Sequence, residues 1–426
     1  MTDPRDGVVL TAEKLVGGGR ALAHHQGATW MVAGALPGEV VTALPDRRRA
    51  GVVEARVLEV LSNPHPGRTA DPCPHAASCG GCDWPHVDPG SGARLKGAAA
   101  AEAARGFPEL IARLAAAPVR ASSLGYRLRA RLHWDPGTGT LGFYESRSQR
   151  VVPIDYCRIL SPRLMQALPA LTAALAGSCP EPVDVEWLEG TAEGDSVAAL
   201  RPGRDGPSKI DPSRVPIKER IAPAVAGFHT LSATGVPGSG WGAHEVTIEL
   251  PTPLRVPVGC FFQGNRHLIN PLFTRVAELT GPGSAPTFDL HAGVGFLAAA
   301  ALFAGPRDLT LVEPCRPAAR AAQCNLPDAR VEVGRTAEAF LARAGHLPQD
   351  ALVITDPPRT GMTRTLRKQL AQWLPHRILM LGCDPATWAR DTGFLCGHGY
   401  RLVEIELFDL FPSTHHVEIL ALLERT

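Results

Sequence analysis

The stretch LMLGCDPATWARD, residues 379–391, decides the fold of the C-terminal part of the chain. Its apolar start, with Ile378 before it, is typical of a buried parallel strand. Asp384 and Pro385 then end the strand and turn the chain, which leaves Cys383 at the carboxyl end of the strand. Ligands bind at that end in open α/β sheets. Cys383 is therefore a candidate nucleophile, although a small buried core residue would fit the same position.

Strands and helices alternate through the whole C-terminal part, residues 255–426. Five further apolar runs read as strands, at residues 287–290, 308–313, 351–355, 401–408 and 417–423. An apolar helix follows the first of these runs and extends to Ala304. This alternation predicts a Rossmann-like, doubly wound sheet for residues 255–426, with ligands at the carboxyl ends of its strands.

The length and composition of the chain indicate a multi-domain globular protein. A chain of 426 residues is too long for one ordinary core, and 45% hydrophobic with 20% charged residues is typical of a globular fold. The net charge of +1 does not by itself indicate a nucleic-acid partner, so any basic surface must be local, as at residues 47–49 or at Arg127, Arg129 and Arg131. No leader or membrane span is apparent, so we expect a cytoplasmic monomer that binds no membrane.

Two further domains precede the Rossmann-like part. Residues 1–62 read as short strands between glycine and proline turns, which predicts a small OB-like β-barrel. Such barrels often bind RNA or single strands, but a barrel without a ligand fits the pattern equally well. Residues 63–254 predict a mixed, mainly β middle domain: a helix over residues 93–117 that breaks near Pro108, then mostly antiparallel strands from residue 126 to 251, with a loop at 201–213.

A cysteine-rich loop opens the middle domain. It holds three soft metal ligands at x5 and x2 spacing, namely Cys73, Cys79 and Cys82. Gly80 and Gly81 allow the backbone to fold tightly around one metal centre, which needs a fourth ligand. The best candidate for that ligand is Cys157, and His75 and His86 are the alternatives. The spacing predicts a metal site but does not separate zinc from an iron–sulfur cluster.

A glycine pair and an acid predict where a nucleotide-like cofactor would bind. Gly293 and Gly295 lie between a strand and a helix, where glycine lets the backbone approach a bound nucleoside. Glu313 ends the next strand, from which a carboxylate can accept hydrogen bonds from ribose hydroxyls. Only two of the three dinucleotide glycines are present, so we expect S-adenosylmethionine rather than a nicotinamide cofactor. A tight turn and an ordinary surface glutamate would be the structural alternative.

Six segments together resemble the RNA uracil-5-methyltransferases, in their order and spacing. They are Cys260–Asn265, Asp289–Gly295, Glu313, Asp356–Gly361, Cys383–Pro385 and Phe411–Glu418. The front of the chain resembles the branch with a TRAM barrel and a four-cysteine [4Fe–4S] cluster, which modifies 23S ribosomal RNA. The resemblance implies a TRAM domain at residues 1–62, a cluster-bearing domain at 63–254 and a class I methyltransferase domain at 255–426. It also favours a [4Fe–4S] cluster over zinc, with Cys157 as the fourth ligand.

The resemblance further implies a covalent mechanism on a uridine that has left its stack. Cys383 would add to carbon 6 of the uracil, and Glu418 would later remove the proton from carbon 5. Asp356 and Arg359 would assist catalysis. The implied cofactor contacts are Gln263, His291, Gly293, Gly295, Glu313 and Asp356. The implied partner is RNA, with ribosomal RNA favoured and transfer RNA possible.

The sequence departs from the family pattern at four places near these residues. They are Gly382, Asp384, the pair His291-Ala292, and Arg335. An unpaired carboxylate at Asp384 would raise the pKa of the neighbouring thiol and slow its attack. Two other interpretations are an RNA-binding protein with an inactive methyltransferase-like domain, and a zinc protein whose Rossmann-like half binds another nucleotide. Retention of the thiol, the base and the Asp356–Arg359 segment favours a working enzyme.

Overall fold

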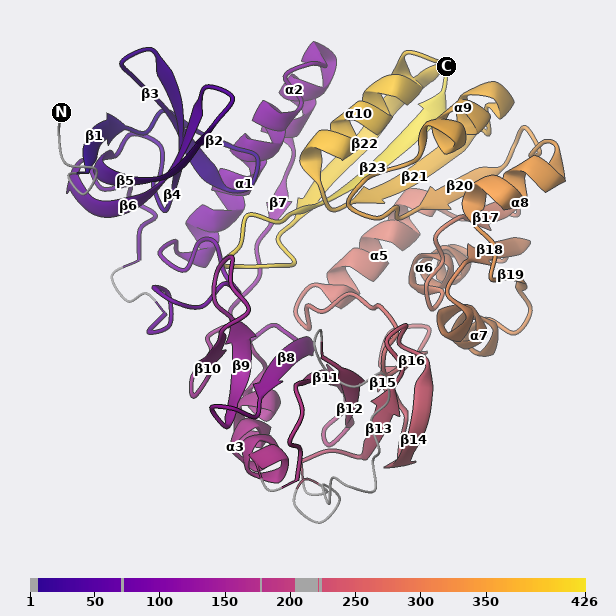
Figure 1. The fold of residues 1–426 in the computed structure, drawn as a ribbon. Helices are drawn as coiled ribbons and strands as arrows, with labels where there is room; N and C mark the ends of the chain where they lie inside the picture. The colour runs from indigo at the N-terminus through magenta and orange to yellow at the C-terminus, as the bar shows by residue number, and fades with distance from the viewer. Residues whose placement is uncertain (1–6, 70–72, 177, 204–220, 222–223) are drawn as a thin grey trace.

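A computed structural model describes residues 7–69, 73–176, 178–203, 221 and 224–426. The described strands form four sheets. Figure 1 shows the N-terminal sheet at upper left, the C-terminal sheet at upper right, and the strands β8–β16 below them. Within those described ranges, no helix is both long and apolar enough to cross a membrane. The predicted loop at 201–213 falls mostly outside the described residues.

The N-terminal residues form a six-stranded, strongly curved sheet in the order β1-β5-β6-β4-β3-β2 (Figure 1). Its strands are β1 (Val8–Thr11), β2 (Lys14–Val16), β3 (Arg20–His25), β4 (Ala28–Ala33), β5 (Val40–Arg49) and β6 (Val52–Ser62). Alternate side chains such as Ala21, Trp30 and Val32 are buried and form one core, as a sheet with a single covered face requires. The short strands agree with the sequence pattern, while the OB-like and TRAM assignments remain predictions.

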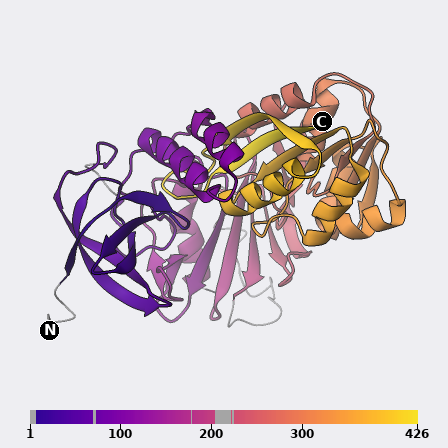
Figure 2. The same cartoon turned by 90° about the horizontal axis from the view of Figure 1, so that it is seen from above.

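Two helices connect this sheet to the C-terminal domain. They are α1 (Pro89–Ala103) and α2 (Pro108–Ala116), and the predicted break between them is confirmed. The carboxylate of Asp88 caps α1 by accepting from the Ser91 N–H. Ala100, Leu110 and Leu114 belong to the same hydrophobic cluster as the C-terminal sheet, and α1 also contacts β2. Figure 2 shows the two helices between the N-terminal sheet and the C-terminal strands.

The central part is built around a seven-stranded sheet in the order β10-β9-β8-β11-β12-β13-β14. Its strands are β8 (Arg129–Asp135), β9 (Thr140–Tyr144), β10 (Val151–Pro153), β11 (Val183–Glu189), β12 (Ser196–Pro202), β13 (Gly227–Leu231) and β14 (Pro237–Gly242). All neighbouring pairs are antiparallel except β12 and β13, so the mostly antiparallel prediction is confirmed. A hairpin of β15 (Glu245–Ile248) and β16 (Leu254–Pro257) follows.

The purely strand-like interpretation of residues 126–251 is wrong at one place. Helix α3 (Pro162–Ala176) lies between β10 and β11 and contains Pro169. Its leucines, such as Leu164, Leu168 and Leu171, recur at helical spacing and pack into the central core. Burial of this apolar stripe outweighs the cost of the internal proline.

The C-terminal domain is a doubly wound sheet in the order β19-β18-β17-β20-β21-β23-β22-β7. Its strands are β7 (Val119–Arg120), β17 (Thr287–Asp289), β18 (Leu309–Glu313), β19 (Arg330–Val333), β20 (Leu352–Thr355), β21 (Arg377–Gly382), β22 (Tyr400–Phe408) and β23 (Glu418–Arg425). Only β23 runs antiparallel to its neighbours. The predicted Rossmann-like sheet is confirmed, whereas β19 and the edge strand β7 were not expected.

Helices cover both faces of this sheet. They are α5 (Ile269–Thr280), α6 (Phe296–Ala304), α7 (Arg316–Asn325), α8 (Ala337–Ala344), α9 (Arg364–Trp373) and α10 (Pro385–Cys396). Within β21, Leu379 and Leu381 face the cluster that holds α5–α7, while Ile378 and Met380 face the cluster of α8–α10. Burial on both faces explains the continuous apolar run of this strand. Strand order reverses between β17 and β20, so the carboxyl ends there form a ligand-binding crevice.

A buried ion pair joins α1 to the segment that connects β22 and β23. The Lys96 ammonium donates to the Asp409 carboxylate and to the carbonyl of Phe411, the latter at 3.0 Å. Both charged side chains are only 1% exposed. Burial lowers the pKa of Lys96 and raises that of Asp409, and their mutual attraction opposes both shifts. Loss of either side chain would leave the other charged group buried and unpaired.

Replacing Lys96 with Ala should therefore destabilise the protein by about 3–5 kcal/mol, because Asp409 would keep an uncompensated buried charge. The matched control is Lys14→Ala, which removes a half-exposed lysine paired with Glu102 and should cost about 1 kcal/mol or less. Urea unfolding of the two variants measures both values. Equal losses would show that the Lys96–Asp409 pair does not stabilise this interface.

Candidate active site at the switch point of the C-terminal sheet

A cavity of about 590 Å³ opens at the carboxyl ends of β17, β18, β20 and β21. The sequence-predicted residues that line it are Gln263, His291, Gly293, Glu313, Asp356, Arg359, Cys383 and Glu418. Gly295 is not among the described lining residues; it precedes α6 with φ of +93° and packs near Leu326. Residues from six separate segments therefore meet at the crevice that strand order places there.

Glu313 is held in place on the side of the cavity near the glycine turn. The Gly293 N–H donates to its Oε2 at 2.8 Å, and the Cys315 N–H donates to its Oε1 at 2.6 Å. Burial raises the pKa of Glu313, and these two hydrogen bonds oppose the shift. A carboxylate has about four lone-pair positions, so Glu313 retains capacity to accept from a ligand. Gly293 has φ of +55°, a backbone conformation that favours glycine.

The thiol and the proposed base approach each other across two neighbouring strands. Gly382 of β21 is paired with Ile419 of β23, so Cys383 and Glu418 lie side by side at the cavity. Burial, followed by the charges of Glu418 and Asp356, raises the pKa of Cys383 to about 12. The nearby guanidinium of Arg359 opposes this shift. These surroundings favour the neutral thiol.

Two buried carboxyl groups share this environment. Burial raises the pKa of Asp356, and burial together with the charge of Asp356 raises that of Glu418 well above its usual value. Arg359 opposes the shift at Glu418, although no ion pair in the described part of the chain joins Arg359 to Asp356. Its guanidinium instead lies 3.2 Å from His416 Nε2. A raised pKa makes Glu418 a stronger base once it has lost its proton.

Several buried polar atoms of this region have no hydrogen-bond partner among the described residues. They include Gln263 Oε1, Asp289 Oδ2 and Glu418 Oε2. Gln263 and Glu418 line the cavity, and both are about as buried as core residues. Because a buried polar atom without a partner is costly, these groups indicate a site completed by a polar ligand.

The departures from the family pattern have local structural explanations. The side chain of Asp384 caps α10 by accepting from the Thr387 N–H at 2.8 Å, so it is not the unpaired carboxylate that would disturb Cys383. A Cβ at Gly382 would come within 2.8 Å of the buried Trp388 ring, so glycine makes room for this tryptophan.

Of the other two departures, one lines the cavity and the other is not among its described lining residues. His291 lines the cavity and hydrogen-bonds Thr355 Oγ1 at 2.9 Å, and burial lowers its pKa to about 4, so its imidazole is neutral. Arg335 pairs with Glu332 at 3.2 Å and is not among the described lining residues.

The cysteine-rich loop forms a second, separate cavity with residues of the central domain. Its lining includes Cys73, Cys79, Cys82, Cys157 and His75. His75 Nε2 lies 2.7 Å from an Asp155 oxygen, and His86 is not among the described residues of this lining. Burial raises the pKa of three of the thiols, that of Cys82 to about 12. The structure therefore brings together the four cysteines predicted as ligands.

The spacing of these sulfur atoms bears on the kind of metal. In the described part of the chain, no three cysteine sulfurs all lie within 4.8 Å of one another. A tetrahedral zinc with Zn–S bonds of about 2.3 Å would bring its sulfurs to roughly 3.8 Å from each other. The described sulfurs are therefore not arranged as a closed tetrahedral zinc site.

Several lining residues were not assigned a role from the sequence. Among them are Phe261, Phe411, His416 and Cys315. Phe261 is 60% exposed at the cavity, and the Arg129 guanidinium lies 6.0 Å from its ring centre. Phe261 and His416 belong to segments already identified from the sequence. The feature that could have revealed them as lining residues was an aromatic or imidazole side chain next to a residue with an assigned role.

The chain is 33% identical over 453 residues to the 23S rRNA (uracil(1939)-C(5))-methyltransferase RlmD of Alkalilimnicola ehrlichii, and the match covers 99% of this chain and 97% of that protein. The chain belongs to the RNA uracil-5-methyltransferase family. A second family member, RlmD of Pseudomonas entomophila, is 34% identical over 436 residues, covering 97% and 93% of the two chains. The tRNA (Uracil-5-)-methyltransferase family model matches residues 349–426.

The fold of this family member is also that of a solved structure. The crystal structure of Pyrococcus abyssi tRNA (uracil-54, C5)-methyltransferase, in complex with S-adenosyl-L-homocysteine, superposes with a TM-score of 0.73. The match covers 98% of this chain and all of that chain at 21% identity. At this identity the likeness shows the shared fold, which includes the methyltransferase sheet.

Replacing Glu418 with Gln should lower the pKa of Cys383, because it removes a negative charge that favours the neutral thiol. At a given pH between about 8 and 11, iodoacetamide should then modify Cys383 about 3- to 10-fold faster, since the thiolate is the reactive form. Peptide mass spectrometry measures the rate at this one cysteine. The matched control is Glu404→Gln, at a carboxylate half-exposed beside Arg275, which should react as the unchanged protein does. Equal rates in both variants would contradict the electrostatic coupling of Glu418 and Cys383.

Proposed function

We propose that this family member transfers a methyl group from S-adenosylmethionine to carbon 5 of a uridine in RNA, with 23S ribosomal RNA as the favoured substrate. The observation that carries the proposal is the convergence of Cys383, Glu418 and Arg359 in one cavity at the switch point of the sheet. The coverage of nearly the whole chain by RlmD relatives supports the choice of RNA. The likeness to a transfer-RNA enzyme supports the same uracil chemistry and keeps transfer RNA as the second candidate substrate.

Carbon 5 of uracil is a weak nucleophile, and the proposed roles of the side chains follow from that. Cys383 first loses its thiol proton to solvent, and the resulting thiolate adds to carbon 6, which places the electrons of the ring double bond on carbon 5 and the carbonyl oxygen. Bound S-adenosylmethionine supplies the electrophilic methyl group that carbon 5 takes. Glu418 then accepts the proton from carbon 5, and the ring double bond re-forms as the carbon–sulfur bond to Cys383 breaks. Arg359 can stabilise the negative charge that the ring carries after addition.

The raised pKa values agree with this order of events. Burial and the charges of Glu418 and Asp356 raise the pKa of Cys383 and so favour its neutral thiol. A cationic methyl donor in the same cavity would favour the thiolate, as Arg359 already does. We infer that Gln263, His291, Gly293, Glu313 and Asp356 hold the donor. The unpaired Gln263 Oε1 and the remaining lone pairs of Glu313 support this assignment.

We further propose that the front of the chain recognises RNA. The curved sheet of β1–β6 is assigned to a TRAM, OB-like barrel domain at residues 1–62. Residues 63–254 are assigned as the domain that holds a [4Fe–4S] cluster on Cys73, Cys79, Cys82 and Cys157. The convergence of the four cysteines on one cavity supports a shared metal centre, and the resemblance to the cluster-bearing branch favours a cluster over zinc. The proposed chemistry moves no electron to or from a metal, so the cluster is assigned a structural and RNA-positioning role.

Replacing Cys383 with Ala should abolish methyl transfer, because no other side chain is proposed to activate carbon 5. The measurement is tritium release from RNA that carries 5-tritiated uridine, with binding of S-adenosylmethionine measured in parallel and expected to persist. The matched control is Cys396→Ala, a thiol at the far end of α10, which should keep activity. Full tritium release by Cys383→Ala would remove the nucleophile assignment. Cofactor and RNA binding without release by the unchanged protein would favour an inactive RNA-binding protein.

Protein purified without oxygen should be brown and hold about four iron atoms per chain. Replacing Cys157 with Ser should remove most of the visible absorption and iron, because one of four ligands is lost. The matched control is Cys179→Ser, at a buried thiol of the same domain that contacts the Glu181 carbonyl and should leave the absorption unchanged. A colourless protein with one zinc atom would contradict the cluster assignment.

A further inference from the structure

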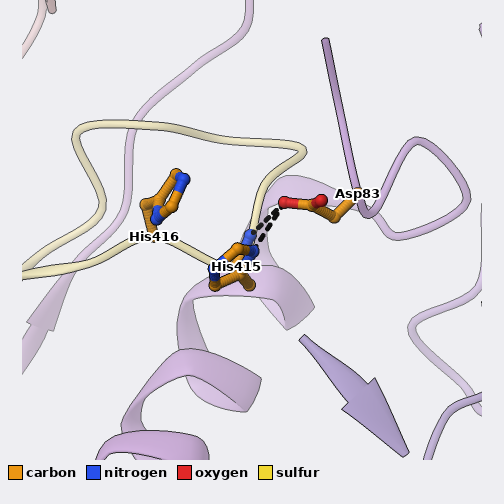
Figure 3. A group of neighbouring side chains, drawn as sticks. All are labelled: Asp83, His415 and His416. Atoms are coloured by element: carbon orange, nitrogen blue, oxygen red, sulfur yellow. Dashed lines mark hydrogen bonds and ion pairs between the residues drawn. The ribbon is translucent and has the colours of Figure 1, made fainter. Parts of the chain in front are cut away.

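Asp83 and His415 form a contact between two segments that are 332 residues apart in the chain. The Nδ1 atom of His415 lies 2.6 Å from Asp83 Oδ2, and the His415 N–H approaches the same oxygen at 3.5 Å. Figure 3 shows the carboxylate pointing at the His415 ring, with His416 next along the same loop. Asp83 directly follows the proposed cluster ligand Cys82, and His415 comes shortly before the proposed base Glu418.

Trp84 strengthens this contact and adds the N-terminal sheet to it. Its N–H donates to the Ser413 carbonyl at 2.9 Å, and its indole Nε1–H donates to the Gly19 carbonyl at 2.8 Å. The Trp84 side chain is 1% exposed. Ser413 has φ of +67°, a conformation that an L-residue holds only when its surroundings fix it. A Cβ at Gly19 would lie 2.6 Å from His415 Cβ, which shows how closely the turn between β2 and β3 approaches.

The segment that receives these contacts, residues 409–417, connects β22 to β23. Phe408 and Glu418 pair across the two strands, so the segment leaves and re-enters the sheet at the proposed base. Its beginning is held by Lys96, which donates to the Phe411 carbonyl, and by Asn265 Nδ2, which donates to the Leu410 carbonyl at 2.9 Å. Its later part carries His416, which lines the cavity and lies beside Arg359.

We propose that Asp83 and His415 are positioning residues that hold this connecting segment, and through it Glu418 and His416, in the geometry needed to remove the proton from carbon 5. This inference rests on the proposed function. It gives the cysteine loop a second role besides contact with RNA, because a shift of Cys82 would move Asp83 and Trp84 with it. Cys383 directly follows β21 and receives no contact from Asp83 among the described hydrogen bonds, so its addition to uracil should depend much less on the pair.

Asp83, His415 and His416 also offer a set of ligand atoms that lie within 4.8 Å of one another. Two imidazoles and a carboxylate can bind a transition metal. The charges around His416 oppose a cation, however. Burial, followed by the charges of His415, Arg359 and Lys96, lowers the pKa of His416 to about 4, with Asp83 acting the other way. His415 is already hydrogen-bonded to Asp83, and His416 lies beside Arg359, so the geometry points to a hydrogen-bonded brace.

The test compares Asp83→Ala with the unchanged protein in two assays. On ordinary RNA, turnover should fall roughly 10- to 100-fold, because a misplaced base slows proton removal after methyl transfer. The covalent, methylated enzyme–RNA adduct should then accumulate. On RNA containing 5-fluorouridine, where fluorine cannot leave as a proton does, the rate of adduct formation should stay within about threefold of the unchanged protein. Visible absorption and thermal unfolding verify that cluster and fold are intact.

The matched control is Asp155→Ala. Asp155 makes a similar contact to His75, at 2.7 Å, on the cysteine-lined cavity but away from the connecting segment. It should leave both assays near the level of the unchanged protein. The proposal is overturned if Asp83→Ala slows adduct formation and turnover equally, or if Asp155→Ala reproduces its effect. If the unchanged protein itself forms no adduct with either RNA, the proposed function fails, and this inference with it.

Discussion

Burial of negative charge is the constraint on which the candidate active site depends. Asp356, Glu418 and Cys383 occupy one largely apolar cavity, so each group raises the free energy of ionising the others. Arg359 compensates only in part. Burial therefore disfavours ionisation of the thiol and of both carboxyl groups. A cationic ligand would favour ionisation of all three, because the interaction between charges is strong where water is excluded.

Burial of charge also explains how the connecting segment is held by a residue from outside the C-terminal domain. The connecting segment 409–417 leaves the sheet and cannot be fixed by strand pairing. The Lys96–Asp409 pair fixes its start, and removal of either charge would leave the other buried alone. Helix α1, which supplies Lys96, packs into the core of the C-terminal domain although it follows the N-terminal sheet in sequence. The front half of the chain thus helps to position the residues of the site. If that half contacts RNA, it does so while already joined to the C-terminal domain by these contacts.

The parallel strands could be predicted from the sequence because burial on both faces leaves a continuous apolar run, as at Ile378–Leu381. The cysteine loop and the motif residues could be predicted because their side chains carry the chemistry. Helix α3 was missed because Pro169 argues locally against a helix, whereas its packing on the central sheet favours one. The contact of Asp83 with His415 could not be predicted, because no local pattern relates two residues on such distant segments.

The departures from the family pattern illustrate how packing can preserve a reactive group. Gly382 removes a side chain directly before Cys383, and the ring of Trp388 from the first turn of α10 fills that volume. Asp384 adds a carboxylate directly after the thiol. This carboxylate caps the N-terminus of α10, where a negative group is favourable. Both changes act on the link between strand and helix, and in both the thiol keeps its place at the carboxyl end of β21. The pKa of Cys383 is accordingly raised first by burial and then by the charges of Glu418 and Asp356, whereas Asp384 caps the helix that follows the thiol.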